Sequence, residues 1–139
     1  MLFPKKVKYR KWHTFRKNPE KTGVATRGAE VSFGSFGLKA LTPGRIKSNQ
    51  IEAARKVMSR TVGKTGKIWI RIFPDMPFTS KPAEVKMGKG KGDIQGYCAP
   101  IKPGRILFEV DGVAPSVAAE ALRKAGTKLP VKVKIVARN

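Results

Sequence analysis

The sequence has little of what most enzymes and secreted domains depend on. Among its 139 residues it contains one cysteine, Cys98, and one histidine, His13. A single cysteine excludes a disulfide within the chain and a zinc site built on cysteines. The apolar runs are far shorter than the ~20 residues that span a membrane. The 9 Asp and Glu residues are scattered, and no spacing marks a carboxylate pair or metal cluster. We therefore expect no membrane segment, metal or catalytic centre.

What the sequence has in excess is positive charge. It carries 30 Lys and Arg residues, a formal net charge of +21 and a pI near 10.7. Self-repulsion at this level destabilises a compact chain unless a polyanion neutralises it. A nucleic acid is the favoured partner over an anionic membrane, and no homo-oligomer is expected.

The charge is concentrated at the amino terminus. Residues 1–28 hold nine Lys or Arg residues and one acid, Glu20, and they show no sustained apolar periodicity. We expect them to form a basic RNA-binding arm before a single α+β domain over residues 29–139. An acid-poor amino terminus is also typical of an organellar transit peptide. This segment, however, has no clear serine-rich amphipathic helix and no evident cleavage site.

Residues 29–139 alternate between strand and helix patterns. A helix is predicted over 49–62, with Asn49 as its cap, and a second over 115–126. The first buries Ile51, Ala54, Met58 and Val62; the second buries Val117, Ala118, Ala121, Leu122 and Ala125. Strands are predicted over 31–41, 67–73, 94–101, 105–112 and 131–137, the third and fourth forming a pair. The expected fold is a two-layer α+β sandwich, with both helices on one side of a mixed or antiparallel sheet.

A long loop is predicted over residues 74–93, and it contains the run "KMGKGKG". Two nucleotide-binding motifs come close to matching and fail on spacing. The Gly63-Lys64-Thr65 turn lacks the glycine that a P-loop places five residues earlier, because position 58 is Met58. In the second, Gly90-x-Gly92 requires a third glycine where Gln95 stands. We expect no nucleotide cofactor.

Catalysis by a cysteine–histidine pair is also disfavoured. His13 lies in the arm, far in the sequence from Cys98, and Cys98 is best read as a small strand residue.

Two stretches are suited to RNA. In the arm, four rings (Tyr9, Trp12, His13 and Phe15) alternate with seven cations: Lys5, Lys6, Lys8, Arg10, Lys11, Arg16 and Lys17. Cations pair with phosphates while flat rings stack on unpaired bases. In the loop, glycines let the backbone approach a phosphate, and the lysines add charge without selecting a base. The alternatives are a disordered solubilising tail for the arm and a flexible hairpin tip for the loop.

Several phrases together resemble one family. They are "KYRKWH" (8–13), "VSFGSFGLKAL" (31–41), "QIEAAR" (50–55), "GKIWIRIFPDMP" (66–77), "MGKGKG" (87–92), "PGRILFEVDGV" (103–113) and "KLPVK" (128–132). In this order they resemble the bacterial-type large-subunit ribosomal protein L-sixteen family. The resemblance implies an α+β sandwich on large-subunit (23S-type) rRNA, near the helices that support the peptidyl transferase centre. It also implies roles in subunit assembly and in positioning tRNA at the aminoacyl site, beside neighbouring ribosomal proteins.

The resemblance and the charge pattern together nominate the site residues. The rRNA-binding set is Lys5, Lys6, Lys8, Tyr9, Arg10, Lys11, Trp12, His13, Arg16 and Lys17, with Arg55, Arg60 and Arg71 as further candidates. A solvated surface is the alternative for these last three. The loop facing rRNA and tRNA is Lys86, Met87, Gly88, Lys89, Gly90, Lys91 and Gly92.

The sequence departs from the family pattern in two places. Lys86 stands where similar proteins usually have arginine, which removes the planar guanidinium fork. The match is also loose over residues 13–30. The expected location is the cytoplasmic ribosome, with an organellar ribosome left open. The rival functions are a free RNA- or DNA-binding regulator and a nucleotide-dependent enzyme.

Overall fold

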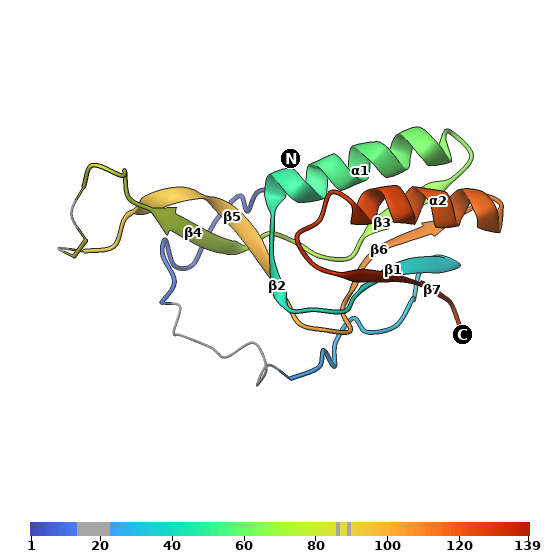
Figure 1. The fold of residues 1–139 in the computed structure, drawn as a ribbon, viewed down its shortest axis with the longest axis horizontal. Coiled ribbons are helices and arrows are strands. Elements are labelled where there is room, and N and C mark those ends of the chain that lie inside the picture. Colours follow the sequence, from blue (N-terminus) through green and yellow to red (C-terminus); the bar gives the residue numbers. More distant parts are fainter. Residues whose placement is uncertain (14–22, 86, 89) are drawn as a thin grey trace.

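The computed structural model describes residues 1–13, 23–85, 87–88 and 90–139. The predictions for Phe15, Arg16, Lys17, Lys86 and Lys89 therefore lie outside the described residues. Two helices, α1 (Ser48–Val62) and α2 (Pro115–Gly126), lie side by side over one face of a four-stranded sheet (Figure 1). The order of that sheet is β3 (Lys67–Ile70), β6 (Ile106–Asp111), β1 (Phe36–Ala40) and β7 (Val133–Ala137).

A second, three-stranded sheet extends away from the helices (Figure 1). Its order is β2 (Gly44–Lys47), β5 (Asp93–Ile101) and β4 (Met76–Ser80). All pairings between the described strands are antiparallel. The α+β class with both helices on one side is confirmed, and the strands form two antiparallel sheets in place of the single mixed or antiparallel sheet predicted.

The helices follow their apolar spacing. In α1 the predicted stripe of Ile51, Ala54, Met58 and Val62 is buried. The helix begins one residue before the predicted start, and Gln50 Oε1 accepts a hydrogen bond of 2.9 Å from the Lys47 N–H. The prediction of Asn49 as the cap is wrong, because Asn49 lies inside the helix.

The second helix has the predicted bounds. Ala118, Ala121, Leu122 and Ala125 are buried as expected, whereas Val117 is half-buried. This apolar face and that of α1 cover the core around Leu38, Leu107 and Phe108.

The predicted loop over 74–93 is too long, because β4 lies within it. Met76–Ser80 pairs with β5, and Pro77 stands opposite Tyr97 in that ladder. A proline lacks the N–H that a central strand must donate, but β4 is an edge strand with one neighbour. The loop therefore shrinks to residues 81–92, the tip of a β-hairpin.

The predicted pairing of 94–101 with 105–112 is also wrong. β5 pairs with β2 and β4, whereas β6 pairs with β1 and β3. The chain passes from one sheet to the other through residues 102–105. A short Pro-Gly connection normally joins two strands of one hairpin, but here it joins two sheets.

Candidate nucleic-acid interface

The hairpin loop lies at the end of the molecule farthest from the helices (Figure 1). Met87 is 99% exposed there. Gly88 and Gly90 have φ angles of 99° and 107°, a region that side chains with a Cβ rarely adopt. The space around both glycines is open, so conformation and not packing requires glycine. Lys81 Nζ donates to the carbonyl of Gly88 and braces the loop from its base.

The structure brings the arm and the loop together. Lys11 Nζ donates to the carbonyl of Lys91 at 3.3 Å, and Lys91 Nζ donates in return to the carbonyl of Trp12. Both lysines thus donate to neutral carbonyls, so these contacts leave their positive charges without a neutralising partner. Positive charge from two segments about eighty residues apart is gathered at one exposed place.

The start of the arm is anchored to the folded part. Leu2 packs against the core, and the ring of Phe3 meets that of Tyr97 edge-on, 6.3 Å between centroids. Beyond this anchor residues 5–10 are all exposed. Tyr9 is 62% exposed, with Lys8 Nζ 5.6 Å from its ring centroid. The described part of the arm is therefore anchored at Leu2 and Phe3, and beyond them it exposes cations and the Tyr9 ring to solvent.

The three other predicted arginines lie elsewhere. Arg55 and Arg60 are on α1, away from the hairpin loop. Arg55 is bonded to Glu52 and Arg60 is exposed in the last turn. The Arg55 hydrogen bond lowers the pKa of Glu52.

The third arginine, Arg71, follows β3, and its guanidinium forms an ion pair with the fully buried carboxylate of Glu109. It thus already has a partner within the fold.

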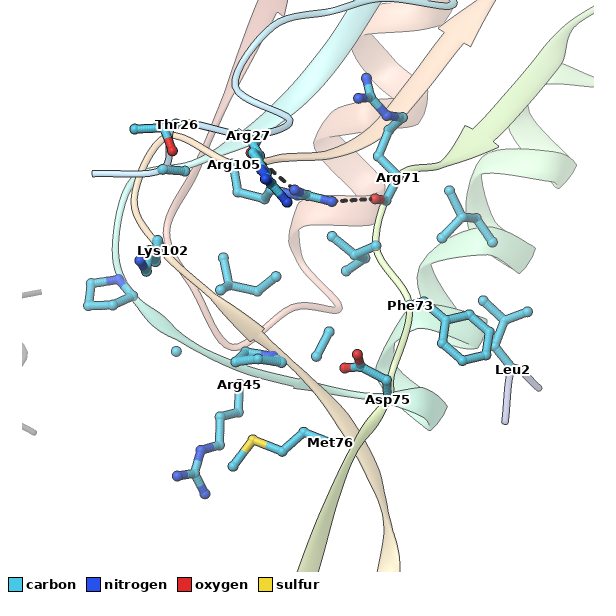
Figure 2. A pocket seen from close by; sticks show the side chains of 18 of the residues that line it. Leu2, Thr26, Arg27, Arg45, Arg71, Phe73, Asp75, Met76, Lys102 and Arg105 are labelled. Carbon is cyan, nitrogen blue, oxygen red and sulfur yellow. Dashed lines mark hydrogen bonds between the residues drawn. The ribbon is translucent and has the colours of Figure 1, made fainter. Parts of the chain in front are cut away.

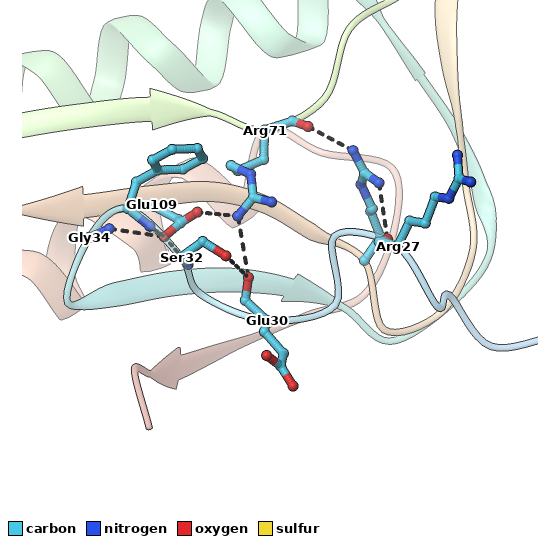
Figure 3. Close-up of polar contacts among 8 residues, drawn as sticks. Arg27, Glu30, Ser32, Gly34, Arg71 and Glu109 are labelled. Atoms are coloured by element: carbon cyan, nitrogen blue, oxygen red, sulfur yellow. Dashed lines mark hydrogen bonds and ion pairs between the residues drawn. The ribbon is translucent and has the colours of Figure 1, made fainter.

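Glu109 is the centre of a polar network that the sequence did not indicate (Figure 3). Its Oε1 accepts the backbone N–H groups of Ser32, Phe33 and Gly34 at 2.9, 2.8 and 3.0 Å. Its Oε2 faces Arg71. Burial raises the pKa of this carboxyl, but the hydrogen bonds from Gly34 and Arg71 outweigh burial, and its pKa is lowered. The network fixes the chain before β1 against β6.

A groove of about 1480 Å³ opens where the two sheets meet (Figure 2). Its walls come from the arm, residues 25–27, β2, the β3–β4 connection and the end of β5. Arg27, Arg45, Lys102 and Arg105 line it, and the sequence analysis singled out none of them. These residues are spread along the chain from 27 to 105 with no motif around them, so only the fold shows their proximity.

Cys98 lies buried in β5, as expected of a small strand residue. Burial raises the pKa of its thiol, which keeps it protonated and unreactive. Within residues 1–13, 23–85, 87–88 and 90–139, no three His, Cys, Asp or Glu side chains are grouped so as to hold a metal ion. In the same residues no helix has the length and apolar character needed to cross a bilayer.

Comparison with known proteins decides the family. The family model described as ribosomal protein L16p/L10e matches residues 4–136. The chain belongs to this family. It is therefore a structural protein of the ribosome and not an enzyme, and the resemblance seen in the sequence is confirmed.

Relatives in the family match over nearly the whole chain. The large ribosomal subunit protein uL16 of Halorhodospira halophila is 56% identical over 138 residues, covering 99% of this chain and 98% of the relative. The uL16 proteins of Rhodopseudomonas palustris and Nitrobacter winogradskyi are 54% and 53% identical, with the same coverage. The family match includes both the arm from residue 4 and the hairpin loop.

Proposed function

We propose that the chain is a structural constituent of the large ribosomal subunit and binds its rRNA through the arm and the hairpin loop. The relatives at 53–56% identity carry the name of a large-subunit protein, which supports this assignment. The observation that carries the RNA-binding part is the meeting of Lys11 and Lys91, which joins both predicted RNA elements on one exposed end.

The same surface suits a folded RNA better than a regular duplex. Exposed lysines recognise phosphates without reading bases, and the open glycine backbone of the loop can approach a phosphate closely. Tyr9 and Trp12 offer rings to unpaired bases. The division into an arm over 1–28 and a domain over 29–139 is part of this proposal.

The resemblance extends the proposal to translation. We assign Lys86, Met87, Lys89 and Lys91 to the region near the tRNA path, where the chain helps position tRNA at the aminoacyl site. It also supports late assembly near the peptidyl transferase centre. Its partners are large-subunit rRNA, tRNA and neighbouring ribosomal proteins, in the cytoplasmic ribosome.

Sedimentation of a tagged chain from its own cells tests the proposal. The chain should migrate with the large subunit and cross-link to its rRNA. A chain that stays folded and monodisperse at the top of the gradient at physiological salt would instead be a free RNA- or DNA-binding regulator. Protection of residues 85–93 by ATP or GTP would favour an enzyme.

A double variant tests the loop. Changing Lys89 and Lys91 to alanine should weaken binding to large-subunit rRNA roughly tenfold at physiological salt, because two phosphate contacts are lost. Aminoacyl-tRNA binding by ribosomes carrying the variant should also fall. The thermal midpoint should not change, and a matching loss of stability would show that the loop is structural. The control is Lys128→Ala with Lys134→Ala, two exposed cations outside the proposed surface.

A further inference from the structure

The groove between the two sheets combines cations with an exposed aromatic ring. Phe33 lines it and is 55% exposed. We propose that this groove binds an unpaired nucleotide of RNA, whose base stacks on Phe33 while Arg27, Arg45 and Lys102 contact the phosphates on either side. The proposal rests on the RNA-binding function above, and Trp12 of the arm borders the groove, but Phe33, Arg45 and Lys102 lie outside the arm and the hairpin loop.

The Phe33 ring is held in place before any ligand binds. Its backbone N–H donates to the buried Glu109 carboxylate at 2.8 Å. Its ring stacks on Trp69, with 6.2 Å between centroids and an interplanar angle of 19°. Arg71 Cζ lies 5.0 Å from the same ring centroid. A flat surface that is already ordered loses little entropy when a base stacks on it.

Gly34 makes this arrangement possible. A Cβ at Gly34 would lie 2.7 Å from the carbonyl oxygen of Val110 and 3.1 Å from the Trp69 ring. Only glycine therefore lets the chain pass close enough for Phe33 to lie over Trp69. The position of the Phe33 ring is therefore fixed by contacts with Glu109 and Trp69 and by the close approach that Gly34 permits.

The charged residues of the groove are mostly cations, set among apolar side chains. Arg27, Arg45 and Lys102 are exposed along it, and Asp75 is the only acidic residue in its described lining. The guanidinium of Arg105 donates to the carbonyls of Arg27 and Arg71 at 3.0 and 2.8 Å (Figure 2). Arg105 is thus a positioning residue that ties the cationic part of the groove to the segment carrying Arg71.

This combination selects a nucleotide over other anions. A phosphate alone, or an acidic peptide, would use the cations but leave the Phe33 ring without a role. An unpaired nucleotide offers a flat base and two flanking phosphates. A duplex keeps its bases stacked on each other and offers only its phosphates.

The test uses the purified full chain and a labelled oligouridine of about eight nucleotides, a length within the usual range of single-strand sites. Phe33→Leu should weaken binding about fivefold or more, because the leucine keeps the apolar bulk but loses the stacking face. Phe33→Tyr should bind like the wild type. The matched control is Phe78→Leu, which removes a ring beneath Lys47 Nζ, 5.1 Å away, outside the groove.

A second pair of variants tests the cations. Arg45→Gln with Lys102→Gln should reduce the slope of log affinity against log salt by about 1.4, because each phosphate contact on a single strand contributes about 0.7. Lys128→Gln should leave the slope unchanged. Thermal midpoints measured in parallel separate loss of binding from loss of folding. Ultraviolet cross-linking should attach uridine at Phe33 or Trp69.

The proposal is overturned if Phe33→Leu binds the oligouridine as tightly as the wild type while Phe33→Leu still folds. It is also overturned if an RNA duplex competes as well as a single strand. If Phe33→Leu weakens the binding of polyglutamate as much as that of the oligouridine, the groove does not select a nucleotide. That result would indicate an acidic protein partner and would overturn the proposal. If the wild-type chain binds neither the oligouridine nor large-subunit rRNA, the proposed function fails; if only the Phe33 effect is missing, the groove alone is excluded.

Discussion

Two regions of the molecule differ in whether their charged side chains form ion pairs. We call the four-stranded sheet with α1 and α2 the body, and residues 1–13 with the β4–β5 hairpin the basic extension. Among the described residues, every acid in an ion pair lies on α1, β6 or α2: Glu52, Glu109 and Glu120. The described lysine hydrogen bonds of the basic extension, by contrast, run to backbone carbonyls.

This difference separates stability from binding. The body neutralises part of its charge internally and buries the core around Phe108. The basic extension leaves its cations available to a polyanion. Substitutions in the body should therefore change folding, and those in the basic extension should change binding and its dependence on salt.

The largest effect is expected in the body. Arg71→Met leaves the buried Glu109 carboxylate without its cation, and the free energy of unfolding should fall by about 3–5 kcal/mol. Chemical denaturation measures this change. Arg123→Met, which breaks the exposed pair with Glu120, is the control and should change the free energy of unfolding far less, because water and salt screen an exposed pair. Equal losses in the two variants would contradict a structural role for the Arg71–Glu109 pair.

The next effect is expected in the arm. Deleting the arm would also remove Leu2 from the core, so neutralisation is the cleaner change. With Lys5, Lys6 and Lys8 changed to glutamine, the salt slope of rRNA binding should fall by about two to three, with unfolding unaltered. An unchanged slope would remove these lysines from the interface. The control is the same change at three exposed lysines of the carboxyl-terminal region, Lys128, Lys132 and Lys134.

The smallest effect is a dependence of stability on pH. The pKa of Glu109 is lowered in the folded chain, since hydrogen bonds from Gly34 and Arg71 outweigh the burial that raises it. A lowered carboxyl pKa contributes stability above its unfolded value of 4.5, and that contribution is lost as pH falls through the folded pKa. Unfolding midpoints should thus be steady near neutral pH and drop in acid.

Glu109→Gln identifies the group responsible. This variant should start less stable and show a shallower drop in acid, because glutamine does not titrate. Glu84→Gln, in the exposed hairpin loop, should keep the wild-type slope. The same slope in all three chains would exclude Glu109 as the source.

The sequence predicted the body better than the basic extension. Both helices could be placed because their apolar residues recur every three or four positions, a signal contained within each element. β2 was missed because its four residues, which begin with Gly44 directly after Pro43, carry too little pattern. β4 was missed because Pro77 reads as a break, although an edge strand tolerates it.

The same limit applies to the site. The arm and the hairpin loop could be predicted as RNA-binding segments because their cations are close in sequence. Their contact through Lys11 and Lys91, and the pairing of Arg71 with Glu109 across 38 residues, depend on tertiary structure alone. The pattern of residues within a segment can predict that segment's structure or charge. It does not predict which segments contact one another in the fold.

The passage of the chain from β5 to β6 has a mechanical consequence. β5 runs from the hairpin tip to Ile101, and after residues 102–105 the same chain becomes β6, which is bonded on both sides and buried. Tension applied at the tip is carried along one covalent strand into the most constrained part of the body. The hairpin tip is therefore joined to the core by one strand and a four-residue connection.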